Sequence, residues 1–214
     1  MAEPIGKIEK PPAERFKEGR KLYLVPVIYF NENDPAEYKE KCNRYWQQVA
    51  DQISSLEAKI GEVGRVYYEY ISLSGEAAMA IVERINPSSY QIAKSKCDKG
   101  AVFEAIEERE LLEEAMDWER CLLLGFTSET VASKVSEFYV EASSKRYEVM
   151  IKRINETLKD KEAGLLFVSG GHRLQFPGDM EVFNIFPPAL DEVHCWLRDH
   201  AKVEEKEETP EAED

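Results

Sequence analysis

The stretch LLFVSGGHRLQF, residues 165–176, decides the predicted fold. Two apolar runs flank Gly170 and Gly171, and glycine readily adopts the positive backbone angles that a two-residue hairpin turn needs. Pro177 and Gly178 then predict a second turn, and residues 180–186 a third strand. We therefore expect an antiparallel hairpin that continues into a meander near the C-terminal end of the chain.

A strand and a long helix are predicted at the beginning of the sequence, well before this hairpin. Residues 22–30 are rich in β-forming side chains and predict a first strand, while Pro26 suggests an edge position or a bulge. Asp34 and Pro35 then predict the start of a helix that ends near Gly61. Its apolar side chains recur every three or four residues, at Tyr38, Cys42, Tyr45, Val49, Ile53, Leu56 and Ile60.

The middle of the chain predicts a strand within residues 63–73 and then four helices. Two short helices are expected to end near residues 85 and 97, and a third to cover residues 101–124. The longest helix is predicted near 128–158, and its apolar stripe drifts, so its two halves are expected to pack against different partners. A closing helix is predicted from Pro188 onward.

This order of elements predicts a mixed α/β protein whose sheet is covered by helices. A chain of 214 residues is long enough for one domain with its own core. We expect a flexible arm over residues 1–20, a single α/β domain over 21–202 and an acidic disordered tail over 203–214.

The charge of the chain restricts its partners. There are 42 acidic against 28 basic residues, which gives a formal net charge of −14. This excess disfavours nucleic acid and anionic membrane surfaces, because both are bound chiefly through Lys and Arg. No apolar run approaches the roughly 20 residues of a membrane span, and no secretory signal is visible, so we expect a cytoplasmic protein. The four cysteines have no metal-ligand spacing and are expected to be free thiols.

Two polar residues lie at the turn of the predicted hairpin. In its register Ser169 lies opposite His172, an arrangement that could supply a nucleophile and a base. The G-x-S-x-G motif of a nucleophile elbow is missing, however, and no helix follows the turn. A cross-strand polar pair beside a turn is the simpler interpretation.

The closing helix carries a second group of polar residues. Asp191 and His194 are three residues apart on one helix face, and Arg198 follows one turn later. With His172 brought close, one carboxylate and two imidazoles could bind a metal ion. The sequence does not show that His172 lies nearby, so we assign no metal site and expect surface polar groups instead.

Charged residues also cluster on two of the predicted helices. An exposed acidic face, which could bind a basic partner, is predicted from Glu107, Glu110, Glu114 and Asp117. The basic residues of the longest helix, Lys145, Arg146, Lys152 and Arg153, are expected to form solvated ion pairs with acidic residues one turn earlier.

Three functional hypotheses follow from these patterns. The first is a cytoplasmic binding or interaction protein that forms a homo-oligomer, preferably a dimer. Its interface would use the longest helix and the strand within residues 63–73, which contains Tyr67, Tyr68 and Tyr70. The second is a small hydrolase-like or metal-assisted enzyme with a pocket between residues 165–176 and the helix at 188–202. Its catalytic residues would be His172, His194 and Asp191. The substrate would be bound by Arg173, Arg198 and Ser169. The third is an RNA-associated factor that uses the basic repeat of the longest helix. The sequence identifies no cofactor.

Overall fold

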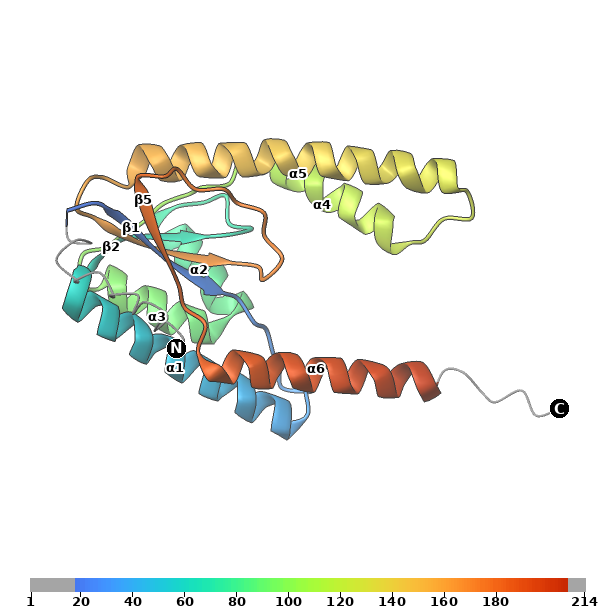
Figure 1. The fold of residues 1–214 in the computed structure, drawn as a ribbon, viewed down its shortest axis with the longest axis horizontal. Coiled ribbons are helices and arrows are strands. Elements are labelled where there is room, and N and C mark those ends of the chain that lie inside the picture. Colours follow the sequence, from blue (N-terminus) through green and yellow to red (C-terminus); the bar gives the residue numbers. More distant parts are fainter. Residues whose placement is uncertain (1–17, 208–214) are drawn as a thin grey trace, which may run out of the picture.

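The computed structural model of the protein describes residues 18–207, with side chains for residues 18–200. A five-stranded parallel sheet with strand order β3-β2-β4-β1-β5 forms its centre (Figure 1). The strands are β1 (Arg20–Pro26), β2 (Val63–Tyr68), β3 (Val102–Phe103), β4 (Ala163–Val168) and β5 (Met180–Asn184). The helices of the described chain are α1 (Ala36–Ile60), α2 (Gly75–Ile85), α3 (Pro87–Cys97), α4 (Arg109–Leu123), α5 (Glu129–Thr157) and α6 (Pro188–Glu207).

The predicted antiparallel hairpin and meander are wrong. β4 lies in the middle of the sheet, where Leu165 is paired in parallel with Tyr23 of β1 and Val66 of β2. A returning strand therefore has no free edge of β4 to pair with. A turn does form locally, because the N–H of His172 donates to the carbonyl of Ser169 at 3.3 Å. The chain then continues without a strand to β5, which pairs in parallel with the opposite edge of β1.

The burial of β4 explains this outcome. All six of its residues are buried, so the strand is covered on both faces. A short continuous apolar run is typical of such a strand in a parallel sheet, whereas a hairpin with one solvated face alternates apolar and polar residues. Gly170 and Gly171 are also not among the glycines with positive φ in the described chain. The turn that two such angles would have produced is therefore not formed.

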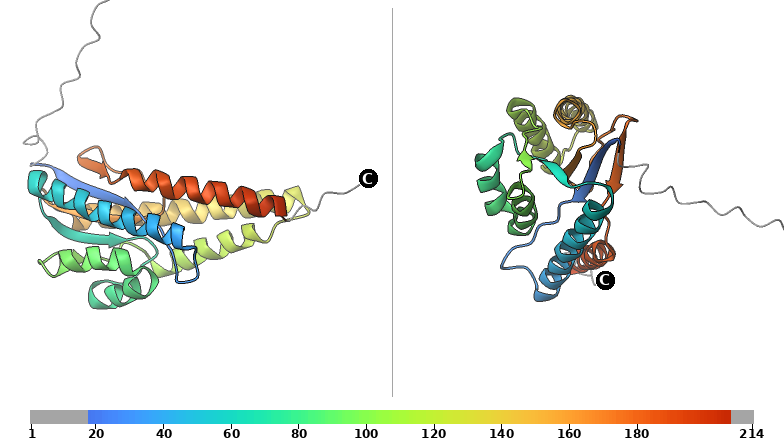
Figure 2. Two further views of the ribbon diagram at one scale, coloured as in Figure 1. Left: turned by 90° about the horizontal axis from the view of Figure 1, so that it is seen from below. Right: turned by 90° about the vertical axis from the view of Figure 1, so that its left-hand side faces the viewer.

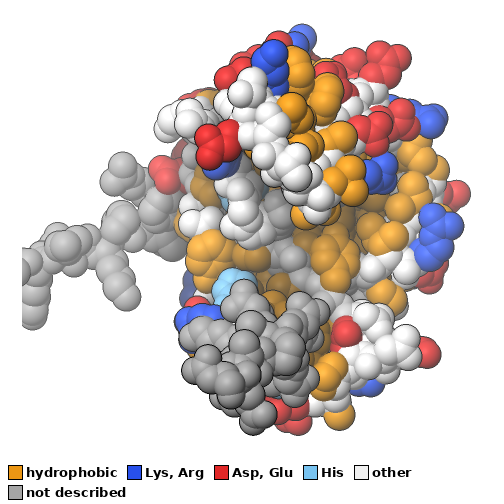
Figure 3. Space-filling view, turned by 90° about the vertical axis from the view of Figure 1, so that its right-hand side faces the viewer, with side chains coloured by type: hydrophobic (Ala, Val, Ile, Leu, Met, Phe, Trp, Pro, Cys, Tyr) orange, Lys and Arg blue, Asp and Glu red, His pale blue; other side chains and the backbone are white. Residues whose placement is uncertain are grey.

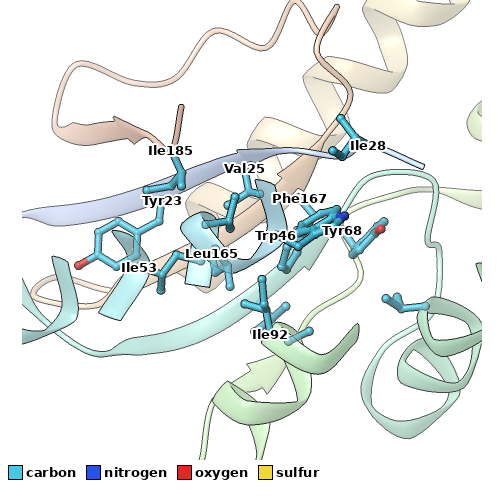
Figure 4. Close-up of a cluster of buried hydrophobic side chains, with 14 of the residues drawn as sticks. Tyr23, Val25, Ile28, Trp46, Ile53, Tyr68, Ile92, Leu165, Phe167 and Ile185 are labelled. Carbon is cyan, nitrogen blue, oxygen red and sulfur yellow. The ribbon is translucent and has the colours of Figure 1, made fainter. Parts of the chain in front are cut away.

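The sheet has two covered faces. On one, which we call the α1 face, side chains such as Tyr23, Leu165 and Phe167 pack against α1, α2, α3 and α6 (Figure 4). On the other, the α5 face, Leu22 and Leu166 pack against the C-terminal half of α5. Successive residues of β1 and β4 thus alternate between two hydrophobic clusters, as the two-residue period of a strand requires.

The two halves of α5 pack against different partners, as predicted. In the C-terminal half, Met150 and Ile154 are buried against the sheet. In the N-terminal half, Phe138 contacts Trp118 of α4, with ring centroids 4.9 Å apart. α4 and this half of α5 form a helical hairpin that projects beyond the sheet (Figures 1 and 2). We call this hairpin, residues 109–142, the helical arm.

The predicted helix at 101–124 begins later than expected. Residues 102–103 form β3 at the edge of the sheet, where Val66 pairs with Phe103. The N–H of Glu104 also donates to the carbonyl of Val66 at 2.9 Å. The chain is therefore extended along β2 at this point, and α4 starts at Arg109.

The ends of the chain are described in part. Residues 1–17 of the predicted flexible arm and 208–214 of the predicted acidic tail lie outside the described residues. Arg20 already belongs to β1, and α6 continues to Glu207. None of the helices within the described residues combines the length and the apolar character that a membrane span requires.

Candidate functional site

The central strand β4 differs from its neighbours in where the chain goes next. After β1 and β2 the chain enters α1 and α2, which cover the α1 face. After β4 it crosses the α5 face instead, where Leu174 is buried in the cluster of that face. In open parallel sheets, ligands bind outside the carboxyl ends of strands at such a reversal. The carboxyl ends of β1, β2 and β4 are therefore the expected position of a ligand site.

A buried charged cluster lies at these strand ends. Glu69 directly follows β2, Glu107 follows β3, and Arg146 extends from α5. Arg146 Nη2 is 3.0 Å from Glu69 Oε1 and 2.5 Å from Glu107 Oε1, and its Nε is 2.9 Å from Glu107 Oε2. All three residues are at most 4% exposed. A single guanidinium thus binds two carboxylates in the protein interior.

Backbone groups stabilise the remaining negative charge of this cluster. The N–H of Ser169 donates to Glu69 Oε2 at 2.6 Å, and the N–H of Tyr70 donates to Glu107 Oε1 at 3.0 Å. The guanidinium of Arg146 lies 4.5 Å from the centroid of the Tyr70 ring. Burial lowers the pKa of Arg146, but Glu107 and Glu69 raise it overall, so the side chain remains cationic.

This cluster joins segments that are far apart in the sequence. Arg146 comes from α5, Glu69 from the end of β2, and the N–H of Ser169 from the connection that follows β4. Buried charges of this kind require well-aligned partners, because desolvation of an unpaired charge costs several kcal/mol. The cluster therefore holds the connection after β4 in a defined position beside α5.

A pocket of about 850 Å³ lies between α5 and this connection. On α5 its lining residues recur at one-turn intervals, and in the connection they are every second residue from 171 to 177. The lining residues are Tyr139, Val140, Ser143, Ser144, Tyr147, Glu148, Ile151, Lys152, Asn155, Gly171, Arg173, Gln175 and Pro177. The alternate residues Leu174 and Phe176 pack toward the core of the α5 face, so the connection forms a wall between pocket and core.

The pocket combines cationic, aromatic and apolar groups. Among the described residues, no side chain forms an ion pair or hydrogen bond with the Arg173 guanidinium. Lys152 contributes a second cation, which lies 4.0 Å from Glu156, and Glu148 contributes a carboxylate. Burial raises the pKa of Tyr147, so its hydroxyl remains protonated and can donate a hydrogen bond.

Three of the predicted site residues lie together in the connection after β4. Ser169 is bound to Glu69 through its backbone N–H, and Arg173 lines the pocket. His172 is half-buried, and its Nδ1 accepts a hydrogen bond from the N–H of Leu174 at 3.3 Å. Burial lowers the pKa of His172, and the carboxylate of Glu69 opposes part of this shift. The neutral imidazole then carries its proton on Nε2.

The other three predicted residues lie elsewhere. Asp191, His194 and Arg198 are exposed on α6, which packs onto the α1 face rather than the α5 face. The part of the chain that the structure describes holds no group of three His, Cys, Asp or Glu side chains suited to a metal ion. His172, His194 and Asp191 therefore do not form the metal-binding group considered from the sequence. The wall opposite residues 171–177 is α5, not α6.

Two charged residues of the site were misjudged from the sequence. Lys145 does pair with Glu141 at 2.8 Å on the surface, but Arg146 is buried and Glu107 is not part of an exposed acidic face. One signal was present in the sequence. Arg146 lies four residues after Ala142 and four before Met150, on the buried stripe of α5.

No protein-family model matches this sequence, and no match was found among curated proteins or solved structures.

Proposed function

We propose that the protein binds a small organic anion in the pocket between α5 and residues 171–177. The guanidinium of Arg173, which has no side-chain partner among the described residues, is the observation that carries this proposal. A planar guanidinium can bind a carboxylate, sulfonate or phosphate through two parallel hydrogen bonds. The pocket volume of about 850 Å³ falls within the range of roughly 300–1,000 Å³ that is typical of small-molecule sites.

The other lining groups suit an anion with a planar apolar body. Tyr139, Tyr147 and Ile151 offer ring faces and aliphatic surface, and Lys152 adds a second positive charge. The carboxylate of Glu148 would repel a ligand that is negatively charged at both ends. It would accept a hydrogen bond from a ligand that places an N–H or O–H beside it. The proposed ligand therefore has its anionic group near Arg173 and an uncharged or donating part along α5.

The proposal can be tested with 8-anilinonaphthalene-1-sulfonate, a planar anion whose fluorescence rises on binding. Titration of the full chain should show one site. Arg173→Gln should weaken binding about tenfold, which corresponds to loss of a charge-assisted contact worth ~1.4 kcal/mol. Arg198→Gln is the matched control, because this arginine is exposed on α6. Equal weakening by both variants, or by neither, would contradict the proposal.

The dye can also bind apolar surface elsewhere, so a second control is needed. Leu123 and Leu124 are the most exposed large hydrophobic residues among those described. The double variant Leu123→Ser/Leu124→Ser should bind the dye as tightly as the unaltered protein. A loss of binding in this variant would place the dye on the helical arm and remove the support for the pocket.

Self-association and a cytoplasmic location are part of the same proposal. The cysteines Cys42, Cys97, Cys121 and Cys195 are all free, which suits a reducing compartment. A dimer would place this binding protein in the commonest class of oligomers. Sedimentation velocity over a hundredfold range of protein concentration tests this point, and a monomer throughout would exclude the dimer.

A further inference from the structure

The outer end of the helical arm carries apolar side chains that nothing in the described chain covers. Leu123 and Leu124 are each 82% exposed, and Phe126 and Val131 are 37% and 45% exposed. Figure 3 looks at the molecule from the end toward which the arm points and shows hydrophobic side chains among charged ones there. Gathered apolar surface of this kind on a projecting element is typical of an interaction site.

The surface around these side chains is acidic. Residues 117–137, which form this end of the arm, contain four acidic side chains and two basic ones. One of the two basic residues, Arg120, is already paired with Asp117 on its own helix at 2.9 Å. The arm therefore presents an excess of carboxylates beside its apolar end.

The arm is also accessible. α4 packs mainly against α5, and Trp118 and Phe138 close the contact between the two helices. The end of the hairpin, where Gly125 makes the turn with φ +70°, stands clear of the sheet (Figures 1 and 2). A partner can thus reach Leu123 and Leu124 without displacing any other element.

We propose that the end of the helical arm binds a basic amphipathic helix of another protein. Leucine-like side chains of that helix would cover Leu123, Leu124 and Phe126, and its Lys or Arg residues would face the carboxylates of the arm. Charge complementarity selects this partner. A second copy would bring two acidic arms together, and nucleic acid or an anionic membrane would meet the same repulsion.

The test uses a fluorescently labelled synthetic helix of leucine and lysine in an amphipathic pattern, and anisotropy as the readout. The full chain should bind it at least tenfold more tightly than the same pattern with glutamate in place of lysine. The full chain should also bind the amphipathic leucine–lysine peptide at least tenfold more tightly than a scrambled leucine–lysine peptide. Leu123→Ser/Leu124→Ser should weaken binding of the first peptide at least tenfold.

Two controls make this result specific. Val102→Ser/Leu197→Ser alters side chains of 46% and 43% exposure on other elements and should change affinity less than twofold. Arg173→Gln should also leave peptide binding unchanged, because the pocket is a separate site. Circular dichroism and the thermal midpoint of each variant verify that the fold is retained.

Several outcomes would overturn the proposal. Unchanged peptide binding by Leu123→Ser/Leu124→Ser would show that the arm is not the site. Self-association that this variant abolishes would identify a second copy as the occupant. Binding to phosphatidylcholine vesicles that depends on the two leucines would identify a lipid surface instead.

Discussion

Arg146 shows how a single buried cation can organise distant parts of a chain. It faces two carboxylates, so the cluster is formally negative, and the backbone N–H groups of Ser169 and Tyr70 supply the compensating dipoles. Removal of the guanidinium would leave Glu69 and Glu107 buried side by side without a cation. Like charges in such a position strongly disfavour the folded state.

Arg146→Met should therefore lower the free energy of unfolding by about 3–5 kcal/mol, because it leaves uncompensated buried carboxylates. Lys145→Met, at the neighbouring exposed position, should lower it far less, as expected for a solvent-screened surface ion pair. Urea unfolding of both variants measures the difference. Similar values for the two would show that the cluster does not hold the connection after β4 in place.

His172 predicts a dependence of stability on pH. Burial lowers its pKa in the folded protein, whereas the unfolded chain has the ordinary value of about 6.5. Below pH 6.5 the unfolded state therefore binds more protons, so stability falls as the pH is lowered from 6.5 through the folded-state pKa. Above pH 6.5 the contribution of His172 is constant.

Urea unfolding between pH 5 and 7.5 can isolate this contribution. His172→Asn should flatten the dependence of unfolding free energy on pH in this range, because the titrating group is gone. His194→Asn, on the exposed face of α6, should keep the slope of the unaltered protein. If both variants keep that slope, another group is responsible for it.

The buried contacts between individual side chains were predicted poorly, because the partners lie far apart in the sequence. Arg146 is 39 residues from Glu107 and 77 from Glu69, so no local pattern connects them. Lys145 and Glu141 are four residues apart, and their surface pair was predicted. The connection after β4 was predicted to hold site residues, since Ser169, His172 and Arg173 are polar groups beside an apolar strand, and their role stays a prediction.

At the scale of elements, local signals were sufficient for most helices. α2 ends at Ile85, where its end was predicted, and α5 begins and ends within one residue of its predicted bounds. The hydroxyl of Ser128 accepts a hydrogen bond from the N–H of Val131 at 3.4 Å, as a helix cap does. The order of strands depends on contacts between remote segments. The pairing of β4 with β1 and β2 could not be read from the turn residues that follow β4.

The close packing of β4 gives an element-scale prediction. A Cβ atom on Gly164 would lie 2.9 Å from Tyr67 Cε2 and 3.0 Å from Leu22 Cδ1, and both side chains are fully buried. Gly164→Ala should therefore destabilise the protein by about 1–3 kcal/mol through overpacking. Gly170→Ala, where a Cβ would meet nothing within 4 Å, should be nearly neutral in urea unfolding. Equal effects would show that the α5 face has room to adjust.

The whole molecule consists of a doubly covered sheet and an arm that extends from it. Clusters on both faces hold β1 and β4, whereas α4 depends mainly on α5 for its packing. α5 belongs to both parts, since its C-terminal half covers the sheet and its N-terminal half supports the arm (Figure 1). The proposed pocket lies along the middle of this helix and the proposed docking surface at its start.

The position of β4 has a consequence for biosynthesis. β1 ends at Pro26, yet its neighbours in the sheet are β4 and β5, which begin only at Ala163 and Met180 and are therefore translated much later. Until β4 and β5 emerge, the nascent polypeptide therefore carries an apolar strand with two unsatisfied edges. Such a segment is open to pairing with other chains.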